Sequence, residues 1–414
     1  MAGQGTFFRS RVSAALLIQI AAFAALIALS LQVAWPANAT TDLVVDCDFP
    51  GGNIVVDSID GTTVSLHQDL RDTQGDWFYW YFRVRGAAGR TLHFRFTKSN
   101  VIGVLGPAVS TDGGKSWQWL GAEAVDGQTF RYAFPPDAGD VRFSFGMPYV
   151  EANLNAFLAR FARNPHLRRG VLCRSRKGRP VELLHLGRLD GPPDHRAVLT
   201  CRHHACEMMA NYTLEGIIEA VLADGDDGRW LREHVEFLVV PFMDKDGVED
   251  GDQGKNRIPH DHNRDYDGES IYPSVRALKQ LVQTWARGRL RFALDMHCPY
   301  IRGPMNEWVY LVGGPDQENW RRVGEFSKIL EEVQTGPIRY RAEHNLPHGK
   351  AWNTLTGPPK SCSRWMAELP GIRIGTSIEI PYANANGEAV TPETARALGR
   401  DLARALRRYL EANE

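Results

Sequence analysis

The stretch RAVLTCRHHACEMMANYTLEGIIEAVL, residues 196–222, decides the fold. It begins with the apolar run RAVLTCR, which is typical of a buried strand, and residues 207–223 have the apolar spacing of a helix. Between strand and helix the segment CRHHACE gathers two histidines, two cysteines and a glutamate. A strand that leads directly into a helix is the repeating unit of α/β folds, whose functional residues lie at the carboxyl ends of strands.

The same alternation continues on both sides of this stretch. Strand-like runs at 181–187, 235–242, 290–297, 308–313 and 376–383 alternate with helical patterns at 151–162, 272–286 and 317–333. Thr391 followed by Pro392 opens a last amphipathic helix with a favourable N-cap and a proline at its first position. The pattern predicts an α/β domain over residues 151–414, with helices on both faces of its sheet.

Residues 40–150 have a different pattern, which predicts strands only. Alternating or aromatic runs occupy residues 76–86, 91–99, 128–134 and 140–146. The segments STDGGKSW and PPDAGD between them have the composition of turns. Short strands at regular spacing predict a small antiparallel β-sandwich ahead of the α/β domain.

The first 39 residues resemble an export signal. Arg9 and Arg11 precede an apolar run over residues 12–34, and the small-x-small sequence at 37–39 fits a signal-peptidase site. The alternative is an uncleaved membrane anchor, because the run approaches spanning length. In either case we expect the rest of the chain to be periplasmic or secreted, with membrane contact only through this segment.

The charge balance narrows the class of partner. Lysine and arginine number 48 and aspartate and glutamate 49, which disfavours a nucleic-acid-binding protein that relies on overall positive charge. A local cationic pocket for a small anionic group is compatible with this balance.

Three residues at strand ends have the chemistry of zinc ligands. His204 and Glu207 are three apart and would face the same way on a first helical turn, and His297 ends a second predicted strand. Two histidines and one glutamate leave one position of a tetrahedral zinc open, as in catalytic sites. The alternatives are a chance H-x-x-E, or a structural site that includes Cys201 and Cys206, which otherwise pack or form disulfides.

The order of the motifs resembles that of the M14 zinc carboxypeptidases. The strand and H-x-x-E, then VPFMDKDGV (240–248), NRDY (263–266), the strand ending in histidine, and SIEI (377–380) follow in that order over roughly residues 150–414. Residues 147–187 are similar to the junction of the cytosolic-carboxypeptidase-like branch, in which a β-sandwich precedes the catalytic domain. The resemblance implies a mixed-sheet zinc carboxypeptidase domain that binds one Zn²⁺.

The resemblance also implies roles for single residues. His204, Glu207 and His297 would bind the zinc, His203 would be a supporting neighbour, and Asp295 would either orient a ligand imidazole or cap a turn as a buried carboxylate.

The catalytic and substrate-binding roles fall on further residues. Glu379 would be the general base, and Arg257 would stabilise the oxyanion. Asn263 and Arg264 would bind the terminal carboxylate of the substrate, for which the planar guanidinium fork is suited.

One part of the family pattern is missing. The segment HGKAWNTLTGPPKSCSRWMAELPG (348–371) contains no tyrosine, where the family usually has one on a mobile loop. Tyr382 would have to approach the site from another direction. Lys360 and Arg364 lie where substrate contacts are expected, and their charges would suit an acidic leaving residue.

The leading hypothesis is an exported zinc metallocarboxypeptidase that acts on a peptide, or on a cell-wall peptide, with a free C-terminal carboxylate. One alternative is a zinc-binding pseudoenzyme or binding module, which the missing tyrosine favours. Another is a zinc-dependent amidase or deacylase, which Asn263 and Arg264 disfavour. Cys206 and Cys298 flank the predicted ligands and either form a disulfide or, as we expect, remain reduced.

Overall fold

The computed structural model describes residues 1–3 and 42–413. The chain divides into two units, Met1–Asp42 and Leu43–Glu414. The predicted export signal, including Arg9 and Arg11, lies outside the described residues. Within the described part of the chain, no helix combines the length and apolar character needed to span a bilayer.

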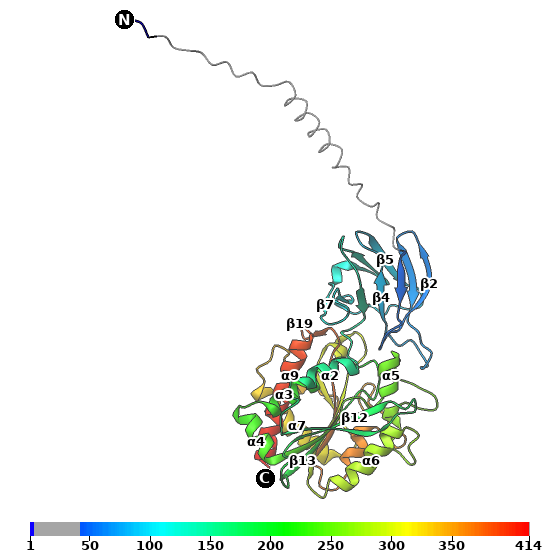
Figure 1. The fold of residues 1–414 in the computed structure, drawn as a ribbon. Coiled ribbons are helices and arrows are strands. Elements are labelled where there is room, and N and C mark those ends of the chain that lie inside the picture. Colours follow the sequence, from blue (N-terminus) through cyan, green and yellow to red (C-terminus); the bar gives the residue numbers. More distant parts are fainter. Residues whose placement is uncertain (4–41, 414) are drawn as a thin grey trace. The chain divides into compact units, whose positions relative to one another are not determined.

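Two five-stranded sheets form the N-terminal part (Figure 1). The first has the order β1 (Val44–Asp46), β4 (Tyr81–Arg85), β10 (Val141–Ser144), β6 (Ala108–Ser110), β7 (Gln118–Trp119). The second has the order β2 (Val55–Asp60), β3 (Thr63–His67), β5 (Thr91–Phe96), β9 (Thr129–Ala133), β8 (Val125–Asp126), and a short helix, η1 (Ala122–Ala124), precedes β8. All strand pairs are antiparallel, as predicted, except β3 and β5, which are parallel.

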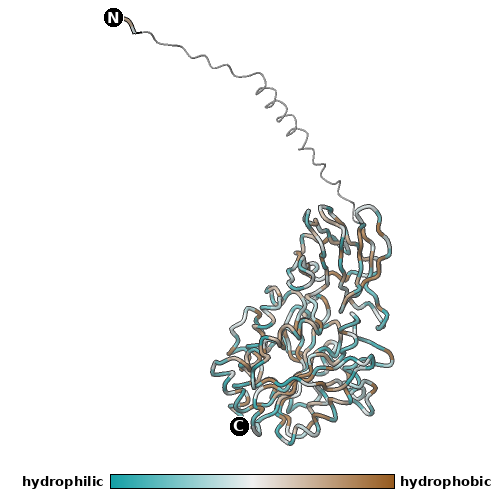
Figure 2. The backbone as a smooth tube through the Cα atoms, viewed as in Figure 1, coloured by the Kyte–Doolittle hydropathy of each residue, from teal (hydrophilic) through white to brown (hydrophobic). Residues whose placement is uncertain are grey.

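Aromatic side chains fill the space between these sheets. Phe82 of β4 lies with its ring centroid 5.4 Å from that of Phe94 of β5, and Phe143 of β10 lies 5.3 Å from Phe130 of β9. Each pair joins one sheet to the other, so the two sheets pack face to face as a sandwich. The alternation of apolar and polar residues along these strands is visible in Figure 2.

The predicted strand at 76–86 is shorter in the structure, because β4 begins only at Tyr81. Tyr79, two residues before this strand, pairs with the second part of the chain. The backbone nitrogen of Tyr79 donates to the Gln253 side chain at 2.7 Å, and that side chain donates back to the Tyr79 carbonyl at 2.8 Å.

A seven-stranded mixed sheet forms the second part of the chain, as the resemblance implied. Its central strands β13, β14, β15 and β17 are parallel to one another, and its outer pairs are antiparallel. The order is β11 (Leu167–Arg174), β12 (Pro180–Gly187), β14 (Val235–Val240), β13 (His195–Cys201), β15 (Leu290–His297), β17 (Ile374–Glu379), β16 (Tyr310–Val312). A hairpin of β18 (Asn384–Ala385) and β19 (Glu388–Ala389) follows this sheet in the chain.

Helices cover both faces of this sheet. The helices are α2 (Glu151–Ala159), α3 (Met209–Leu222), α4 (Asp226–His234), α5 (Lys245–Asp250), α6 (Pro273–Trp285), α7 (Gln317–Val333), α8 (Cys362–Ala367) and α9 (Pro392–Glu411), with the short turns η2 (His262–Arg264), η3 (Pro304–Glu307) and η4 (Ala342–His344). Alternate residues of β13 separate the two faces: Leu199 packs in the core with α3, α7 and α9, and Val198 packs with α6 and α8. This alternation confirms the predicted α/β architecture.

Two glycines let α3 and α9 lie against each other. A Cβ atom on Gly216 of α3 would collide with the Arg396 backbone, and one on Gly399 of α9 would collide with the Thr213 carbonyl. The two helices therefore approach at backbone contact. Because α3 begins just after the segment CRHHACE, α9 supports the part of the chain that carries the predicted ligands.

Candidate active site

The two ligands that the sequence places three residues apart lie in a turn and not in a helix. The segment after β13 turns sharply, and α3 begins only at Met209, so the prediction of a helix from residue 207 was wrong by about half a turn. Arg202 has a positive φ of 62° and is buried. Its Nε donates to the Ala205 carbonyl at 2.9 Å, and this bond holds the turn closed under His204.

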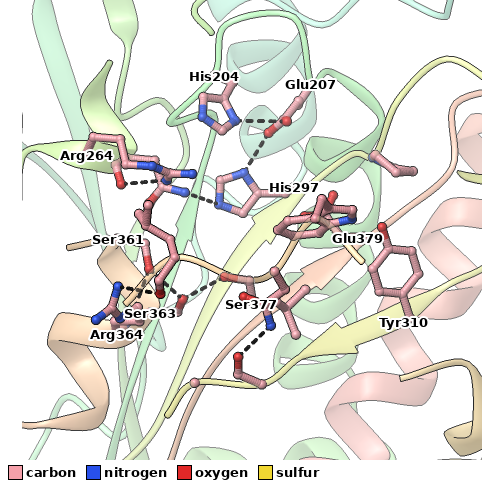
Figure 3. A pocket seen from close by; sticks show the side chains of 18 of the residues that line it. His204, Glu207, Arg264, His297, Tyr310, Ser361, Ser363, Arg364, Ser377 and Glu379 are labelled. Atoms are coloured by element: carbon pink, nitrogen blue, oxygen red, sulfur yellow. Dashed lines mark hydrogen bonds and ion pairs between the residues drawn. The ribbon is translucent and has the colours of Figure 1, made fainter. Parts of the chain in front are cut away.

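The turn brings three candidate ligands together at the carboxyl ends of two strands (Figure 3). Glu207 Oε1 lies 2.9 Å from His204 Nδ1, and Glu207 Oε2 lies 2.8 Å from His297 Nδ1. One ligand atom from each of these residues lies within 4.8 Å of the others. The donor set of two imidazoles and one carboxylate, on side chains that are all buried, fits a zinc ion with an open position.

In a second group of side chains, His203, Asp295 and His297, the ligand atoms also lie within 4.8 Å of one another. However, His203 is already engaged at both ring nitrogens, with Asp295 Oδ1 at 2.7 Å and with the Tyr266 hydroxyl at 2.7 Å. The ligands His204, Glu207 and His297 line a cavity, called the pocket below, together with Glu379. His203 and Asp295 are fully buried and do not line this pocket. Of the two groups, only His204, Glu207 and His297 all line the pocket, so this group is the better candidate for the metal site.

Asp295 lies where an orienting carboxylate must lie. Its Oδ2 is 2.6 Å from His297 Nε2, the ring nitrogen that does not face Glu207. Asp261 has the corresponding place for the other imidazole, with Oδ1 at 3.6 Å from His204 Nε2. Asp261 was not predicted from the sequence, although it stands two residues before Asn263.

These carboxylates fix the charges of the candidate ligands. Burial opposes the charged forms, but Asp295 and Glu207 raise the pKa of His297 well above its usual value. For Glu207, burial again opposes charge, and His204, Lys255 and His297 hold its pKa well below the usual value. The cluster thus contains an ionised glutamate surrounded by cationic groups.

Glu379 is the last residue of β17 and pairs in register with His297 at the end of β15. Its side chain is buried, and its Oε2 accepts no hydrogen bond from any residue of the described chain. Burial raises the pKa of Glu379 to about 7, and Glu207 adds to the effect, while His297 and Lys255 oppose it. This carboxyl can therefore change its protonation state near neutral pH, as a general acid–base group must.

Tyr310 is a pocket residue that the sequence analysis missed. It stands at the start of β16, directly opposite Glu379 in the antiparallel pair, so both side chains point to the same face of the sheet. It lines the pocket, and burial raises the pKa of its hydroxyl. Only the register of the edge strand, which the sequence did not reveal, identifies this neighbour of Glu379.

Lys255 is a second residue that the sequence analysis missed. Its Nζ lies 2.6 Å from Glu207 Oε1 and 4.9 Å from the ring centroid of Trp77, and it lines the pocket. Burial opposes its charge, but Glu207 raises the pKa of Lys255 above its usual value. A cation is therefore present at the metal centre.

Arg257, predicted to stabilise the oxyanion, lies elsewhere, and that prediction needs correction. Its guanidinium pairs with Asp72 at 3.0 Å, Asp244 at 2.7 Å and Asp252 at 2.8 Å. It lines a neighbouring cavity and not the pocket of the candidate ligands. With three carboxylates around it, Arg257 acts as a structural clamp, and the cation nearest the ligands is Lys255.

Asn263 and Arg264 lie in η2 and line the pocket. The amide nitrogen of Asn263 lies 3.3 Å from His297 Nε2, and its Oδ1 accepts from the backbone nitrogen of Cys362 at 2.9 Å. Arg264 is half-buried, and within residues 42–413 its side chain donates only to the Asn263 carbonyl, at 3.1 Å. Among the ion pairs of residues 42–413, none includes Arg264, so its guanidinium is available to an anion.

The two cations predicted near residue 360 differ in position. Arg364, in α8, lines the pocket, and among the described residues its side chain donates only to the carbonyls of Leu355 and Gly357, at 3.3 and 3.1 Å. Lys360 is paired with Glu368 at 2.7 Å and does not line the pocket, so its prediction as a substrate contact is not supported.

Three serines lie beside Arg364 in the same pocket: Ser361, Ser363 and Ser377. Ser377 donates to Ser363 at 2.8 Å, and the hydroxyls of Ser361 and Ser363 lie 3.3 Å apart. Figure 3 shows the three serines and Arg364 below the candidate ligands, at the opposite end of the pocket from His204 and Glu207. The pocket is therefore polar at the end away from the candidate ligands.

The segment without a tyrosine presents Trp352 to the pocket, with about half of its side chain exposed at 52%. Tyr382 does not replace the missing tyrosine. It is buried beneath the site, where its ring packs on Phe145 and its hydroxyl lies 3.8 Å from Cys206 Sγ. Cys206 and Cys298 are both buried free thiols, as expected.

Comparisons with known proteins agree with this arrangement. The model of the zinc carboxypeptidase family, the M14 peptidases, matches residues 154–298, which include all three candidate ligands. An uncharacterised protein of Zymomonas mobilis is 30% identical over 381 residues, which cover 87% of this chain and 94% of the relative. Cytosolic carboxypeptidase 6 of Caenorhabditis elegans is 24% identical over 270 residues, and the alignment covers 58% of each chain.

A solved structure shares the fold over most of the chain. The metallo-carboxypeptidase from Burkholderia cenocepacia superposes with a TM-score of 0.73 at 21% identity, covering 90% of this chain and 100% of that one. Its coverage includes both the N-terminal sheets and the mixed sheet. The strand-end His–Glu–His cluster, the family match and the near-full-length relative lead to one conclusion: the chain belongs to the M14 zinc carboxypeptidases, a family of zinc-dependent hydrolases.

Proposed function

We propose that the protein is a metallocarboxypeptidase that releases acidic residues from the C-termini of peptides. A zinc ion held by His204, Glu207 and His297 would act as a Lewis acid toward the scissile carbonyl and its attacking water. The chain's own residues supply proton transfer, charge stabilisation and substrate recognition.

Glu379 performs the proton transfer in this proposal. Its carboxylate accepts a proton from the attacking water and then delivers it to the leaving amine. A pKa near 7 suits both steps, because the group is neither too weak a base nor too weak an acid at neutral pH. Its position beside His297, at the end of the neighbouring strand, places it within the same pocket.

Lys255 stabilises negative charge that develops on the carbonyl oxygen. It is buried and cationic, and its Nζ lies at the candidate ligand Glu207. A fixed cation in a pocket of low dielectric stabilises such a charge more strongly than one in water.

Substrate recognition rests on one observation: two arginines line the pocket without pairing to any carboxylate of the described chain. Arg264, supported by Asn263, binds the terminal carboxylate of the peptide through its planar fork. Arg364, among the serines, binds a carboxylate on the side chain of the leaving residue. Lys360 makes no contribution, because Glu368 neutralises it.

Product mass spectrometry on a peptide library with randomised C-termini tests this function. We expect release of C-terminal glutamate or aspartate ahead of other residues, no release from C-terminally amidated peptides, and loss of activity with a chelator. Faster release of basic or apolar residues would contradict the acidic preference, and cleavage of amidated peptides would contradict the carboxypeptidase reaction.

We also propose that the protein is exported. The support is in the sequence, where Arg9 and Arg11 precede an apolar run and a small-x-small site. N-terminal sequencing of protein recovered from the periplasm or medium of expressing bacterial cells tests it. We expect a mature N-terminus near residue 40, and an intact Met1 in the cytosolic fraction alone would contradict export.

A further inference from the structure

We infer that the N-terminal sandwich completes the active site, and that Asp72 is the residue through which it positions Lys255. This inference rests on the proposed function, because it concerns the cation assigned to the carbonyl oxygen. It also means that the sandwich takes part in the reaction and is not a separate binding module.

Asp72 lies in the segment between β3 and β4 and reaches into the loop that carries Lys255. Its two carboxylate oxygens accept from the backbone nitrogens of Gln253 at 3.0 Å and Gly254 at 2.8 Å. The second oxygen also pairs with Arg257 Nε at 3.0 Å. One carboxylate thus binds residues on both sides of Lys255, and its side chain is only 10% exposed.

Neighbours of Asp72 hold the same loop. The Thr73 hydroxyl donates to the Lys255 carbonyl at 2.5 Å, and the backbone of Gln74 donates to the Asn256 carbonyl at 3.2 Å. The ring of Trp77, which lines the pocket, lies 4.9 Å from Lys255 Nζ in a cation–π contact. The backbone and the ammonium group of Lys255 therefore both contact the sandwich.

The other side of the loop contacts the turn with the candidate ligands. The Cys206 backbone nitrogen donates to the Gln253 carbonyl at 3.1 Å. Gly254 has a φ of +79°, and a Cβ atom there would collide with the Ala205 backbone nitrogen. The loop is consequently held between Asp72 and the metal-binding turn, which fixes the distance from Lys255 Nζ to Glu207.

The electrostatics make Asp72 hard to replace. Its charge balances Arg257 in a cluster that also contains Asp244 and Asp252. Asparagine in place of Asp72 keeps one acceptor, but it presents an NH₂ group to a backbone nitrogen or to Arg257. Two donors would then face each other, and the loop would move away from the sandwich.

A double-mutant cycle on the full-length zinc-loaded protein tests the inference. We expect Asp72→Asn to lower kcat for a C-terminal glutamate peptide by about tenfold to 10²-fold, with KM changed by less than about twofold. In the Lys255→Met background, which is itself impaired, Asp72→Asn should change kcat by less than about twofold, because the residue through which it acts is gone. Losses that multiply in the double variant would overturn the inference.

A second measurement does not depend on turnover. In chelated protein, acylation of Lys255 by acetic anhydride, followed by peptide mass spectrometry, should be several times faster in Asp72→Asn than in wild type. The matched control is Asp46→Asn, which removes a carboxylate of similar exposure (14%) that pairs with Arg83 inside the sandwich. Equal acylation rates in wild type and both variants would overturn the positioning role.

Thr73→Val is a milder variant if Asp72→Asn fails to fold. It removes only the hydroxyl bond to the Lys255 carbonyl, and we expect a kcat loss of about two- to fivefold that again disappears with Lys255→Met. A loss that persists in that background contradicts the inference. Failure of the proposed function is distinguishable, because wild type would then hydrolyse none of the peptides while the acylation rates still report on Asp72.

Discussion

Replacing Glu379 by glutamine should make the zinc-free protein more stable, and increasingly so as the pH rises. Glutamine has nearly the shape of the protonated carboxyl but cannot ionise. Burial raises the pKa of Glu379 from 4.5 to about 7 in the folded protein, so the unfolded chain releases this proton more readily than the folded one. Below pH 4.5 the carboxyl is protonated in both states and does not destabilise the fold. As the pH rises toward 7 the unfolded chain ionises first, so ionisation progressively lowers the free energy of unfolding.

The expected size follows from the two pKa values. At pH 8 the ionised Glu379 costs the folded state about 3 kcal/mol, and at pH 5 about 1 kcal/mol, since each unit of pKa corresponds to about 1.4 kcal/mol. Glu379→Gln should therefore raise the free energy of unfolding by about 2 kcal/mol more at pH 8 than at pH 5. The side chain is only 7% exposed, so solvent screening reduces this figure little.

Urea unfolding of chelated wild type and Glu379→Gln at pH 5 and pH 8 measures the difference. Glu388→Gln is the matched control, because Glu388 is exposed on β19 and does not line the pocket. Its effect on the free energy of unfolding should be the same at both pH values. A stability difference between Glu379→Gln and wild type that is independent of pH would refute the reasoning. It would mean that the carboxyl does not titrate differently in the folded and unfolded states.

Four further predictions concern zinc binding and turnover. Glu379→Gln should retain zinc but lose about 10²- to 10⁴-fold in kcat, and a variant that kept more than about a tenth of the rate would exclude Glu379 as the base. His204→Ala should lose the zinc measured by atomic absorption while the circular dichroism of the sandwich persists; full metal content would reject this ligand. Arg264→Lys should lower kcat/KM for free-acid peptides about tenfold or more, because lysine lacks the bidentate fork of arginine. Unchanged kinetics would exclude Arg264 as the residue that binds the terminal carboxylate. Arg364→Met should reduce the preference for C-terminal glutamate over glutamine about tenfold or more, with Lys360→Met as the control that leaves it unchanged; equal effects would exclude Arg364 as the selecting residue.

The elements that were predicted best have local signals at their ends. Helix α7 occupies the predicted residues 317–333, because the Asp316 side chain caps its first backbone nitrogens. Helix α9 begins after Thr391 with Pro392 at its first position, as expected. The short helices α4, α5 and α8 and the edge strand β11 were missed. Segments of six to nine residues carry too little periodicity to separate them from loops.

The site residues at the ends of strands were predicted correctly, whereas those in an irregular loop were not. His297 and Glu379 end adjacent parallel strands, so strand order alone brings them together. Lys255 and Arg257 are two residues apart in an irregular loop, where no periodicity predicts the direction of a side chain. Gly254 and Asn256 both have a positive φ, and the glycine was the sequence signal that the backbone turns beside these two cations.

The contact between Gly216 and Gly399 also bears on when the site can form during synthesis. Helix α9 is made of the last residues of the described chain, and α3, which begins just after Glu207, packs directly on it. Until α9 leaves the ribosome, α3 lacks the partner that covers it, and contacts between residues so far apart in the sequence form late. The ligands would consequently assemble only after α9 has been synthesised, so a nascent chain that ends before α9 would lack a working hydrolase.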